Sequence, residues 1–360
     1  MVDRPVRLED YALLGDCRSA ALVSRDGSID WWCVPRFDSP ACFAALLGTP
    51  DHGRFLITPI GPAQSSRRYR PGSMVLETEH DTDAGRVRVV DCLVPGPDRP
   101  LLVRLVEGVS GEVAMRVELI VRFDYGSVVP WVRHSDGAWQ AVAGPDGLEL
   151  RTPVRLAGAN LTTTGQFTVG RRDRVPFVLG WFPSHDLVPV PANAVQLISR
   201  TAKHWKTWSA RCGYHGQWRD PVLRSLLTLE SLTYAPTGGI VAAPTTSLPE
   251  TLGGSRNWDY RYCWVRDATL TLEALIAGGY SDEAARWRQW LLRAAAGRPD
   301  ELQTMYGVAG ERRLTELELD WLPGYGGAKP VRTGNAAHEQ LQLDVYGELA
   351  DVLWQGVRAD

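Results

Sequence analysis

The decapeptide AMRVELIVRF, residues 114–123, changes side-chain type at almost every step. One set of alternate positions is apolar and the other holds the charges: Met115, Val117, Leu119, Val121 and Phe123 against Ala114, Arg116, Glu118, Ile120 and Arg122. Successive side chains of a β-strand point to opposite faces, so this period of two predicts a strand with one face in the core and one in water.

Similar segments flank this strand on both sides. RVRVVDCLV (86–94), LLVRLVEGV (101–109) and VPFVLGWF (175–182) repeat the alternation, and clusters of glycine or proline separate them. Many short strands without intervening helices are typical of two packed antiparallel sheets. We therefore expect residues 1–190 to form an antiparallel β-sandwich domain.

The period changes to 3.6 after Pro189. Apolar stripes with helical spacing follow one another at Ala194, Leu197, Ile198, Thr201, Trp205 and Trp208; at Val222, Leu226, Leu229 and Thr233; at Ala268, Leu272, Leu275 and Ile276; at Ala284, Trp287, Leu291, Leu292 and Ala295; and at Leu341, Val345, Leu349 and Val352. Such stripes predict amphipathic helices. We expect a helical linker over 191–215 and helical hairpins over 216–360, the last helix beginning near Ala336, in a multi-domain β + α protein.

The composition is that of an ordinary globular protein, with 44% hydrophobic and 22% charged residues among 360 and a net charge of -3. This balance gives no broad positive field for nucleic acid or an anionic membrane, and no window reaches the roughly 18 apolar residues of a membrane span. The six cysteines form no C-x-x-C pair, and the seven histidines show no metal-ligand spacing. We therefore expect reduced thiols, a cytoplasmic location, and neither a metal nor a cofactor.

The stretch RNWDYRYCWVRDATLTLEAL, residues 256–275, gathers rings and charges directly before a predicted helix. A pyranose offers C–H groups to an aromatic ring and hydroxyls to paired donors and acceptors. A loop that carries Tyr260, Tyr262, Trp264, Arg266 and Asp267 just before a helix is therefore a suitable sugar-binding surface. The alternative is a buried aromatic cluster whose Arg–Asp pair satisfies the backbone at a helix N-terminus.

The run DYRYCWVRD, residues 259–267, resembles the sugar-binding loop of the glucoamylases in glycoside hydrolase family 15. Four further segments resemble the bacterial branch of that family, which contains glucoamylase-like enzymes and trehalases: TTSLPE (245–250), GGSRNWDY (253–260), LQTMYGVAGERRLTELELDWLPGY (302–325) and PVRTGNAAHEQLQLDVYGE (330–348). Residues 11–47 resemble the trehalase-like N-terminal domain that precedes the catalytic barrel in this branch.

This resemblance implies an (α/α)6 helical toroid and inverting hydrolysis of the α-glucosidic bond of an α-glucoside or oligosaccharide. It also implies that Tyr260, Trp264, Arg266 and Asp267 line the pocket for the non-reducing glucosyl unit, and that Arg332 and Asn335 belong to the next polar segment. Inverting glycosidases use two carboxyl groups about 6.5–9.5 Å apart, and nothing in residues 1–360 matches the family's segments for either. We therefore assign no catalytic residue and expect an incomplete toroid, with the remaining helices beyond residue 360 or on a separate chain.

Two hypotheses remain open. In the first, the chain is the front part of a glucoamylase-like or trehalase-like enzyme, and Val345, Leu349, Val352 and Trp354 form a partly exposed apolar patch where later helices would pack. In the second, it is an inactive remnant, or a carbohydrate-binding or interaction protein built on the β-sandwich. A downstream reading frame with a Trp-Glu segment and further helices favours the first. The linkage (α-1,1, α-1,4 or α-1,6) and the oligomeric state stay open.

Overall fold

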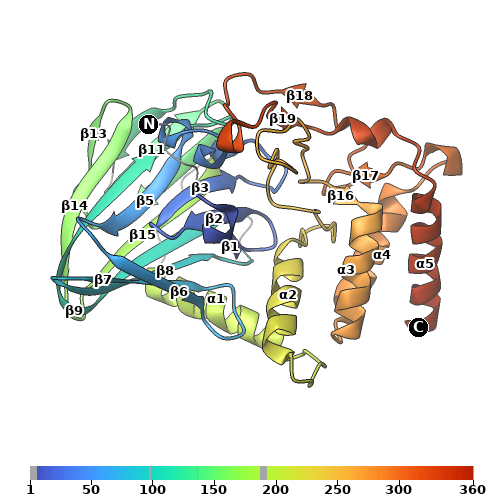
Figure 1. Cartoon of the computed structure of the whole chain (residues 1–360), viewed down its shortest axis with the longest axis horizontal. Helices are drawn as coiled ribbons and strands as arrows, with labels where there is room; N and C mark the ends of the chain where they lie inside the picture. Colours follow the sequence, from blue (N-terminus) through green and yellow to red (C-terminus); the bar gives the residue numbers. More distant parts are fainter. Residues whose placement is uncertain (1–5, 97–98, 136, 187–192, 360) are drawn as a thin grey trace. The chain divides into compact units, whose positions relative to one another are not determined.

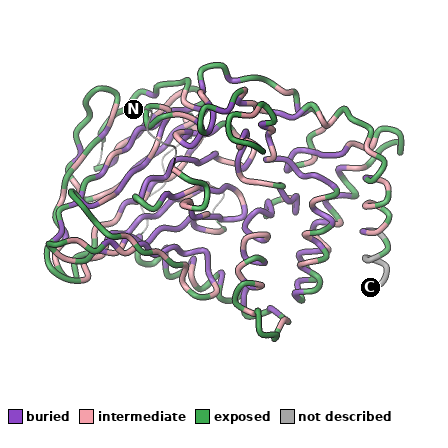
Figure 2. The backbone as a smooth tube through the Cα atoms, viewed as in Figure 1, coloured by how far each residue is buried: buried purple, intermediate pink, exposed green. Residues whose placement is uncertain are grey.

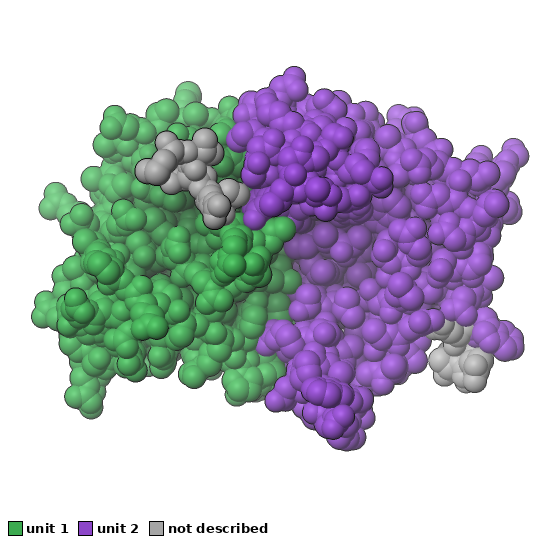
Figure 3. Space-filling view, viewed as in Figure 1, with its two compact units in different colours: residues 1–16, 20–35, 39–206 green, residues 17–19, 36–38, 207–360 purple. Residues whose placement is uncertain are grey.

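The computed structural model describes residues 6–96, 99–135, 137–186 and 193–359. Contacts divide the chain into two compact units, which are coloured separately in Figure 3. We call residues 1–16, 20–35 and 39–206 the β unit, and residues 17–19, 36–38 and 207–360 the helical unit. None of the helices in the described ranges has the length and apolar character of a membrane crossing.

The strands of the β unit form antiparallel pairs that fall into two sets sharing β9 (Figure 1). The first set is β1 (Tyr11–Gly15), β2 (Ala20–Ser24), β3 (Ser28–Cys33), β5 (Arg54–Pro59), β9 (Leu101–Ile120), β14 (Thr162–Gly170) and β13 (Ala157–Ala159), with β4 (Ala41–Phe43) paired to β3. The second set is β6 (Gln64–Tyr69), β7 (Leu76–Thr82), β8 (Gly85–Leu93), β9, β15 (Arg174–Pro183), β12 (Asp146–Arg151), β11 (Ala138–Ala143) and β10 (Trp131–Ser135).

Strand β9 runs through both sets. Residues 101–111 pair with β8 and β15, and residues 112–120 pair with β5 and β14. At the joint, Gly111 has a φ of +66°, and a Cβ there would lie 2.1 Å from the Ala84 carbonyl oxygen. A bulge or a glycine lets a strand bend without ending. The two segments predicted as separate strands therefore form one continuous strand.

Both sets of strands contribute to one apolar core (Figure 2). Ile29 and Phe55 come from the first set, and Val89 and Phe177 come from the second. The rings of Phe55 and Phe177 meet edge to face, with their centroids 6.2 Å apart. This packing between the two sets is the arrangement that the alternating sequence predicts.

Helix α1 (Ala194–Ser209) covers a second apolar cluster of the β unit. Its Leu197 and Ile198 pack in one cluster with Val90 and Val103, which come from β8 and β9. The Asn193 side-chain oxygen accepts hydrogen bonds from the N–H groups of the next turn and begins the helix. The first turns of the segment predicted as a linker therefore pack on strands of the β unit.

The alternation that predicts β9 is confirmed over its second half. Met115, Val117 and Leu119 are buried, whereas Arg116 is exposed. It ends at Ile120 and Arg122, which are buried although the pattern assigned them to the wet face. Arg122 lies beyond the ladder with β5 and β14, so the period of two no longer applies to it. Ile120 still pairs with Arg54 of β5 and is buried on the face that the pattern assigned to water.

The helical unit contains α2 (Arg219–Ser231), α3 (Val265–Ala277), α4 (Ser281–Ala294) and α5 (Asp344–Ala359), with the short strands β16 (Cys263–Trp264), β17 (Met305–Tyr306), β18 (Leu317–Glu318) and β19 (Arg332–Thr333). Helix α3 contacts α2, α4 and α5, and α4 also contacts α5 (Figure 1). The chain between these helices is mostly irregular.

Most of the predicted helical stripes are buried, namely Leu226, Ala268, Leu272, Leu275, Ala284, Trp287 and Leu291. Ile276 and Leu292 are exposed, because each lies at the edge of its stripe. In α2, Leu223 and Leu227 are buried beside Leu226, whereas Val222 and Leu229 of the predicted stripe are only partly buried.

The last helix differs most from its prediction. Ala336–Glu339 form a short 3-10 helix, and the backbone becomes extended at Gln340. Helix α5 therefore begins at Asp344. Val345 and Val352 are buried rather than part of an exposed patch, since α5 packs against α3 and α4. Trp354 is exposed, as predicted.

The prediction of an antiparallel β domain followed by a helical region is confirmed. The toroid, its incompleteness and the domain boundaries at residues 190 and 215 stay predictions.

Candidate functional site

The predicted sugar-binding residues lie where β16 meets α3 in the helical unit. Strand β16 pairs with β17, which sets Trp264 opposite Met305. Trp264 is also the N-cap residue of α3, with an extended backbone at φ -78° and ψ 128°. Because the helix begins at Val265, Asp267 falls in its first turn, where the helix dipole favours an acidic side chain.

Tyr260 and Trp264 form the aromatic part of the site. Their ring centroids are 6.2 Å apart, with the planes inclined by 41°. Trp264 belongs to a buried cluster with Met305 and Leu314, and Tyr260 packs against that cluster. Burial, assisted by the nearby carboxylates of Glu250 and Asp267, raises the pKa of the Tyr260 hydroxyl. Tyr260 therefore remains an O–H donor at neutral pH.

Arg266 forms the centre of the charged part. Its guanidinium carbon lies 5.6 Å from the centroid of the Trp264 ring. Its terminal nitrogens lie 3.6 Å from a carboxylate oxygen of Asp267 and 3.6 Å from one of Asp344. The Arg266 side chain is 46% exposed and both carboxylate side chains are 44% exposed. Exposed ion pairs contribute about 0–1 kcal/mol, so these groups can exchange partners for ligand hydroxyls at little cost.

Sequence reasoning missed Asp344. The last helix was predicted to begin near Ala336, which placed this aspartate inside the helix. It is instead the first residue of α5. Acidic residues are enriched in the first turn of helices, and that preference was the available signal. Arg266 thus joins the N-terminal ends of α3 and α5, which the sequence pattern alone does not bring together.

A second Arg–Asp pair in the same stretch has a different role. Asp259 and Arg261 are completely buried, and the Arg261 guanidinium donates to both carboxylate oxygens, at 2.9 and 2.6 Å. Asp259 also accepts a hydrogen bond from the N–H of Gly334, at 3.2 Å. This stretch therefore contains one buried Arg–Asp pair, which lies before β16 and not at the N-terminus of a helix, whereas Arg266 and Asp267 remain accessible.

Asn335 holds two segments together. Its side-chain nitrogen donates to the Asp259 carbonyl at 3.0 Å, and its side-chain oxygen accepts from the Ala337 N–H at 3.0 Å. The preceding Gly334 has a φ of +72°, and a Cβ there would lie 1.9 Å from the Thr315 carbonyl oxygen. The Gly-Asn dipeptide thus allows a close backbone approach around Asp259.

Arg332 is held in a similar way. Its guanidinium donates to the carbonyls of Ser255 and Asn257 and lies 3.0 Å from a carboxylate oxygen of Glu316. It also lies 4.6 Å from the centroid of the Trp258 ring. These contacts fix the loop before Tyr260.

The structure therefore gathers Tyr260, Trp264, Arg266 and Asp267 and adds Asp344 to them. It engages Arg332 and Asn335 in contacts within the protein. Exposed charges beside an aromatic ring can bind a polar ring with an apolar face. The assignment of all six predicted residues to a sugar site stays a prediction.

Two family models match the chain. Residues 216–360 match the glycosyl hydrolases family 15, and residues 1–167 match the trehalase-like N-terminal region. Both matches agree with the resemblance seen in the sequence motifs.

Curated relatives extend this similarity over nearly the whole chain. A trehalase of Mycolicibacterium smegmatis is 37% identical over 96% of this chain and 56% of its own length. A trehalase of Mycobacterium tuberculosis is 36% identical over 96% of this chain and 55% of its own length. The chain thus spans a little over half of these curated relatives.

A solved structure shows a similar fold. A bacterial glucoamylase complexed with acarbose superposes with a TM-score of 0.60 at 13% identity, covering 85% of this chain and 52% of the glucoamylase. The fold is therefore similar to that of a known glucoamylase structure over most of this chain.

Proposed function

The chain is a relative of the glycosyl hydrolases of family 15 with a trehalase-like N-terminal region, and on this premise we propose that it takes part in the hydrolysis of α-glucosidic bonds. Trehalose is the first candidate substrate, because curated trehalases are 36–37% identical to 96% of the chain. Maltose and isomaltose are the candidates for a glucoamylase-like specificity.

One observation carries this proposal: the exposed ion pair of Arg266 and Asp267 lies beside the ring of Trp264. The guanidinium offers donors in a fixed plane and the carboxylate offers acceptors, so adjacent sugar hydroxyls can bind to both. The indole edge and the Tyr260 ring supply an apolar wall for the C–H groups of the sugar. In this proposal Asp267 and Arg266 position the non-reducing glucosyl unit.

The chemistry proposed for the complete site is inverting hydrolysis. A carboxylic acid protonates the leaving oxygen while a carboxylate about 6.5–9.5 Å away activates water on the opposite face. We assign neither role to a residue of this chain. Its part in the reaction is to bind and orient the glucosyl unit, which lowers the barrier only in the presence of both carboxyl groups.

The test combines calorimetric titration with trehalose, maltose and isomaltose and an assay for released glucose. Asp267→Asn removes the charge at the start of α3, and Asp282→Asn removes a 90% exposed charge at the start of α4 as the matched control. We expect weak binding of one disaccharide, reduced about tenfold or more by Asp267→Asn and unchanged by Asp282→Asn.

We expect no glucose release from residues 1–360 alone. Release that disappears with Asp267→Asn would show that a catalytic pair lies within these residues. Equal binding to wild type and the Asp267→Asn variant would overturn the sugar-site assignment and favour an interaction protein built on the β unit.

A further inference from the structure

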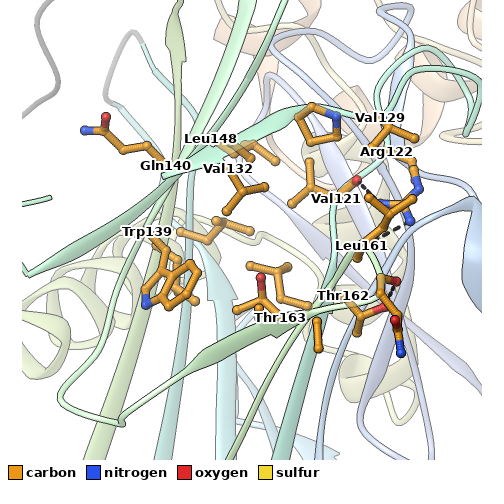
Figure 4. Close-up of a pocket in the computed structure, with 18 residues that line it drawn as sticks. Val121, Arg122, Val129, Val132, Trp139, Gln140, Leu148, Leu161, Thr162 and Thr163 are labelled. Carbon is orange, nitrogen blue, oxygen red and sulfur yellow. Dashed lines mark hydrogen bonds between the residues drawn. The ribbon is translucent and has the colours of Figure 1, made fainter. Parts of the chain in front are cut away.

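The β unit contains a cavity of about 320 Å³ that is distinct from the candidate sugar site. Residues of β10, β11, β12 and the β13–β14 turn line it, together with the segment that follows β9 (Figure 4). Its volume lies in the lower part of the roughly 300–1,000 Å³ range of small-molecule sites. All of its lining residues belong to the β unit.

The lining is mainly aliphatic. Leu148, Leu150 and Leu179 are buried in its wall, and Trp139 lies at the end opposite Arg122 and Leu161 (Figure 4). Gln140, a polar lining residue, is already engaged, because its side chain bonds to Glu149 and Arg133. A sugar would leave most of its hydroxyls against hydrocarbon, which is costly.

Arg122 is the charged residue of the lining, and it is 7% exposed. Its guanidinium donates to the carbonyl oxygens of Val121 and Leu161, at 2.7 and 3.1 Å. These bonds use two of its five N–H donors. Within the part of the chain that the structure describes, Arg122 forms no ion pair with a carboxylate.

Burial lowers the pKa of the Arg122 guanidinium, and the carboxylate of Asp51 offsets this effect only in part. A buried cation without a close counter-ion is unfavourable. An anion bound in the cavity would supply the missing counter-ion. The cavity thus combines apolar walls with a positive charge at one end.

The β13–β14 turn, which lines the cavity near Arg122, carries a strained residue. Asn160 and Leu161 connect β13 and β14 with φ values of +51° and +59°. A branched side chain rarely adopts this left-handed conformation, which favours glycine or asparagine. Leu161 nevertheless occupies it, 68% exposed, and its carbonyl holds Arg122. Positive φ at both residues is the geometry of a tight two-residue hairpin turn, and the leucine is kept in it at some cost in backbone strain.

We propose that this cavity binds a small apolar carboxylate, with the hydrocarbon part among the leucines and the carboxylate on Arg122. At about 30 Å³ for each water-sized group, the cavity holds roughly ten such groups. A medium-chain carboxylate such as octanoate matches this size. Leu161, which also lines the cavity, supplies a further apolar contact. The site is independent of α-glucoside hydrolysis, so either proposal can fail alone.

Calorimetric titration of the full chain with octanoate, 1-octanol and octylammonium tests the chemistry. We expect octanoate to bind at least about tenfold more tightly than 1-octanol, because a charged hydrogen bond adds to the same apolar contacts. Octylammonium should bind more weakly than either. Equal affinity for octanoate and octanol, or binding of neither, would refute the proposal.

Three variants localise the site. Arg122→Gln should remove the preference for octanoate over octanol and leave octanol binding unchanged. Val132→Glu places a negative charge on a 49% exposed lining residue and should weaken octanoate binding about tenfold or more. Val195→Glu makes the same change at a 41% exposed valine of α1 and should leave binding unchanged.

Leu161→Gly separates a ligand site from a purely structural turn. Glycine relieves the backbone strain, so the melting temperature should rise or stay the same. Octanoate affinity should nevertheless fall about three- to tenfold, because an apolar contact of the lining is lost. Unchanged affinity in this variant and in Val132→Glu would contradict the proposed site, even if Arg122→Gln fails to fold.

Discussion

Both units bury an arginine–aspartate pair, but the two pairs hold different kinds of structure. In the β unit, Arg104 pairs with Asp91 at 2.9 Å, and its other nitrogens donate to the carbonyls of Phe55 and Gly27. Those residues belong to, or adjoin, strands already joined by ladder hydrogen bonds. In the helical unit, Asp259 and Arg261 lie in an irregular segment, where Gly334 and Asn335 bond to the same aspartate.

The difference shows how a loop-rich region becomes rigid. A sheet distributes its hydrogen bonds over many backbone groups, so one side-chain pair is an addition to them. The segments before β16 and after β19 have few such ladders, and side-chain bonds to the backbone take their place. The loops around Asp259 therefore depend on that side chain for their conformation more than the strands around Asp91 depend on Asp91.

The largest expected effect comes from neutralising these aspartates. Asp91→Asn and Asp259→Asn should each lower the free energy of unfolding by about 3–5 kcal/mol, because each leaves a buried guanidinium unpaired. Asp259→Asn should also speed amide hydrogen exchange locally, in residues 256–264 and 332–337. Hydrogen-exchange mass spectrometry measures both the loss of global stability and the local exchange. Unchanged exchange in those segments would show that the loops do not depend on Asp259.

The second prediction concerns Glu230 in α2, whose side chain shares Arg286 with Glu283. Burial raises its pKa from 4.5 to about 7, Arg286 opposes this rise and the Glu283 carboxylate adds to it. A folded pKa above the unfolded value means that stability is greatest below the unfolded pKa. The free energy of unfolding should therefore fall by about 2–3 kcal/mol as the pH rises from about 4.5 to 7.

Glu230→Gln should remove this slope and stabilise the protein at pH 8 in chemical denaturation. Glu339→Gln, at a 79% exposed side chain, is the control and should leave the slope in place. A pH dependence that survives Glu230→Gln would assign the slope to another group.

The third prediction gives the opposite slope in the β unit. Burial lowers the pKa of His80 from 6.5 to about 4, and Arg104 adds to the effect. A folded pKa below the unfolded value means that stability is lost as the pH falls from about 6.5 to 4, here by about 2 kcal/mol. Acid unfolding of wild type and His80→Gln, monitored on peptides of β7 and β8 by hydrogen exchange, measures this loss. His185→Gln, at a 79% exposed side chain, should behave like wild type.

The smallest effect on stability is expected at the exposed pair. Arg266→Ala should change the free energy of unfolding by no more than about 1 kcal/mol, since its ion pairs are solvated. Arg298→Ala, at a 73% exposed arginine with a similar Asp partner, is the matched control. The variants should differ in disaccharide binding, which only Arg266→Ala reduces. A large loss of stability in Arg266→Ala would identify a structural residue instead.

Periodicity predicted the regular parts of both units and little of the rest. The alternation around Val117 and the spacing of Leu272 and Leu275 follow directly from the geometry of strands and helices. The same patterns could not show that Gly111 bends β9 rather than ending it, since that depends on its neighbour Ala84.

The candidate site was predicted in part for a similar reason. Trp264, Arg266 and Asp267 are close in sequence, so their proximity follows from the start of one helix. Asp344 joins them through the packing of α5 on α3, a long-range contact that no local pattern encodes. Likewise, no spacing distinguishes the buried Asp259 from the exposed Asp267.

The position of β9 between four partner strands has a consequence for the order of synthesis. β5 and β8 precede it, but β14 and β15 follow, and β15 ends at Pro183. At about 5–20 residues per second, roughly 3–13 s pass between translation of Ile120 and Pro183. During that interval one edge of the nascent strand has no partner, and unpaired strand edges aggregate readily. Slower translation of this interval would therefore lower the yield of folded protein without changing its final stability.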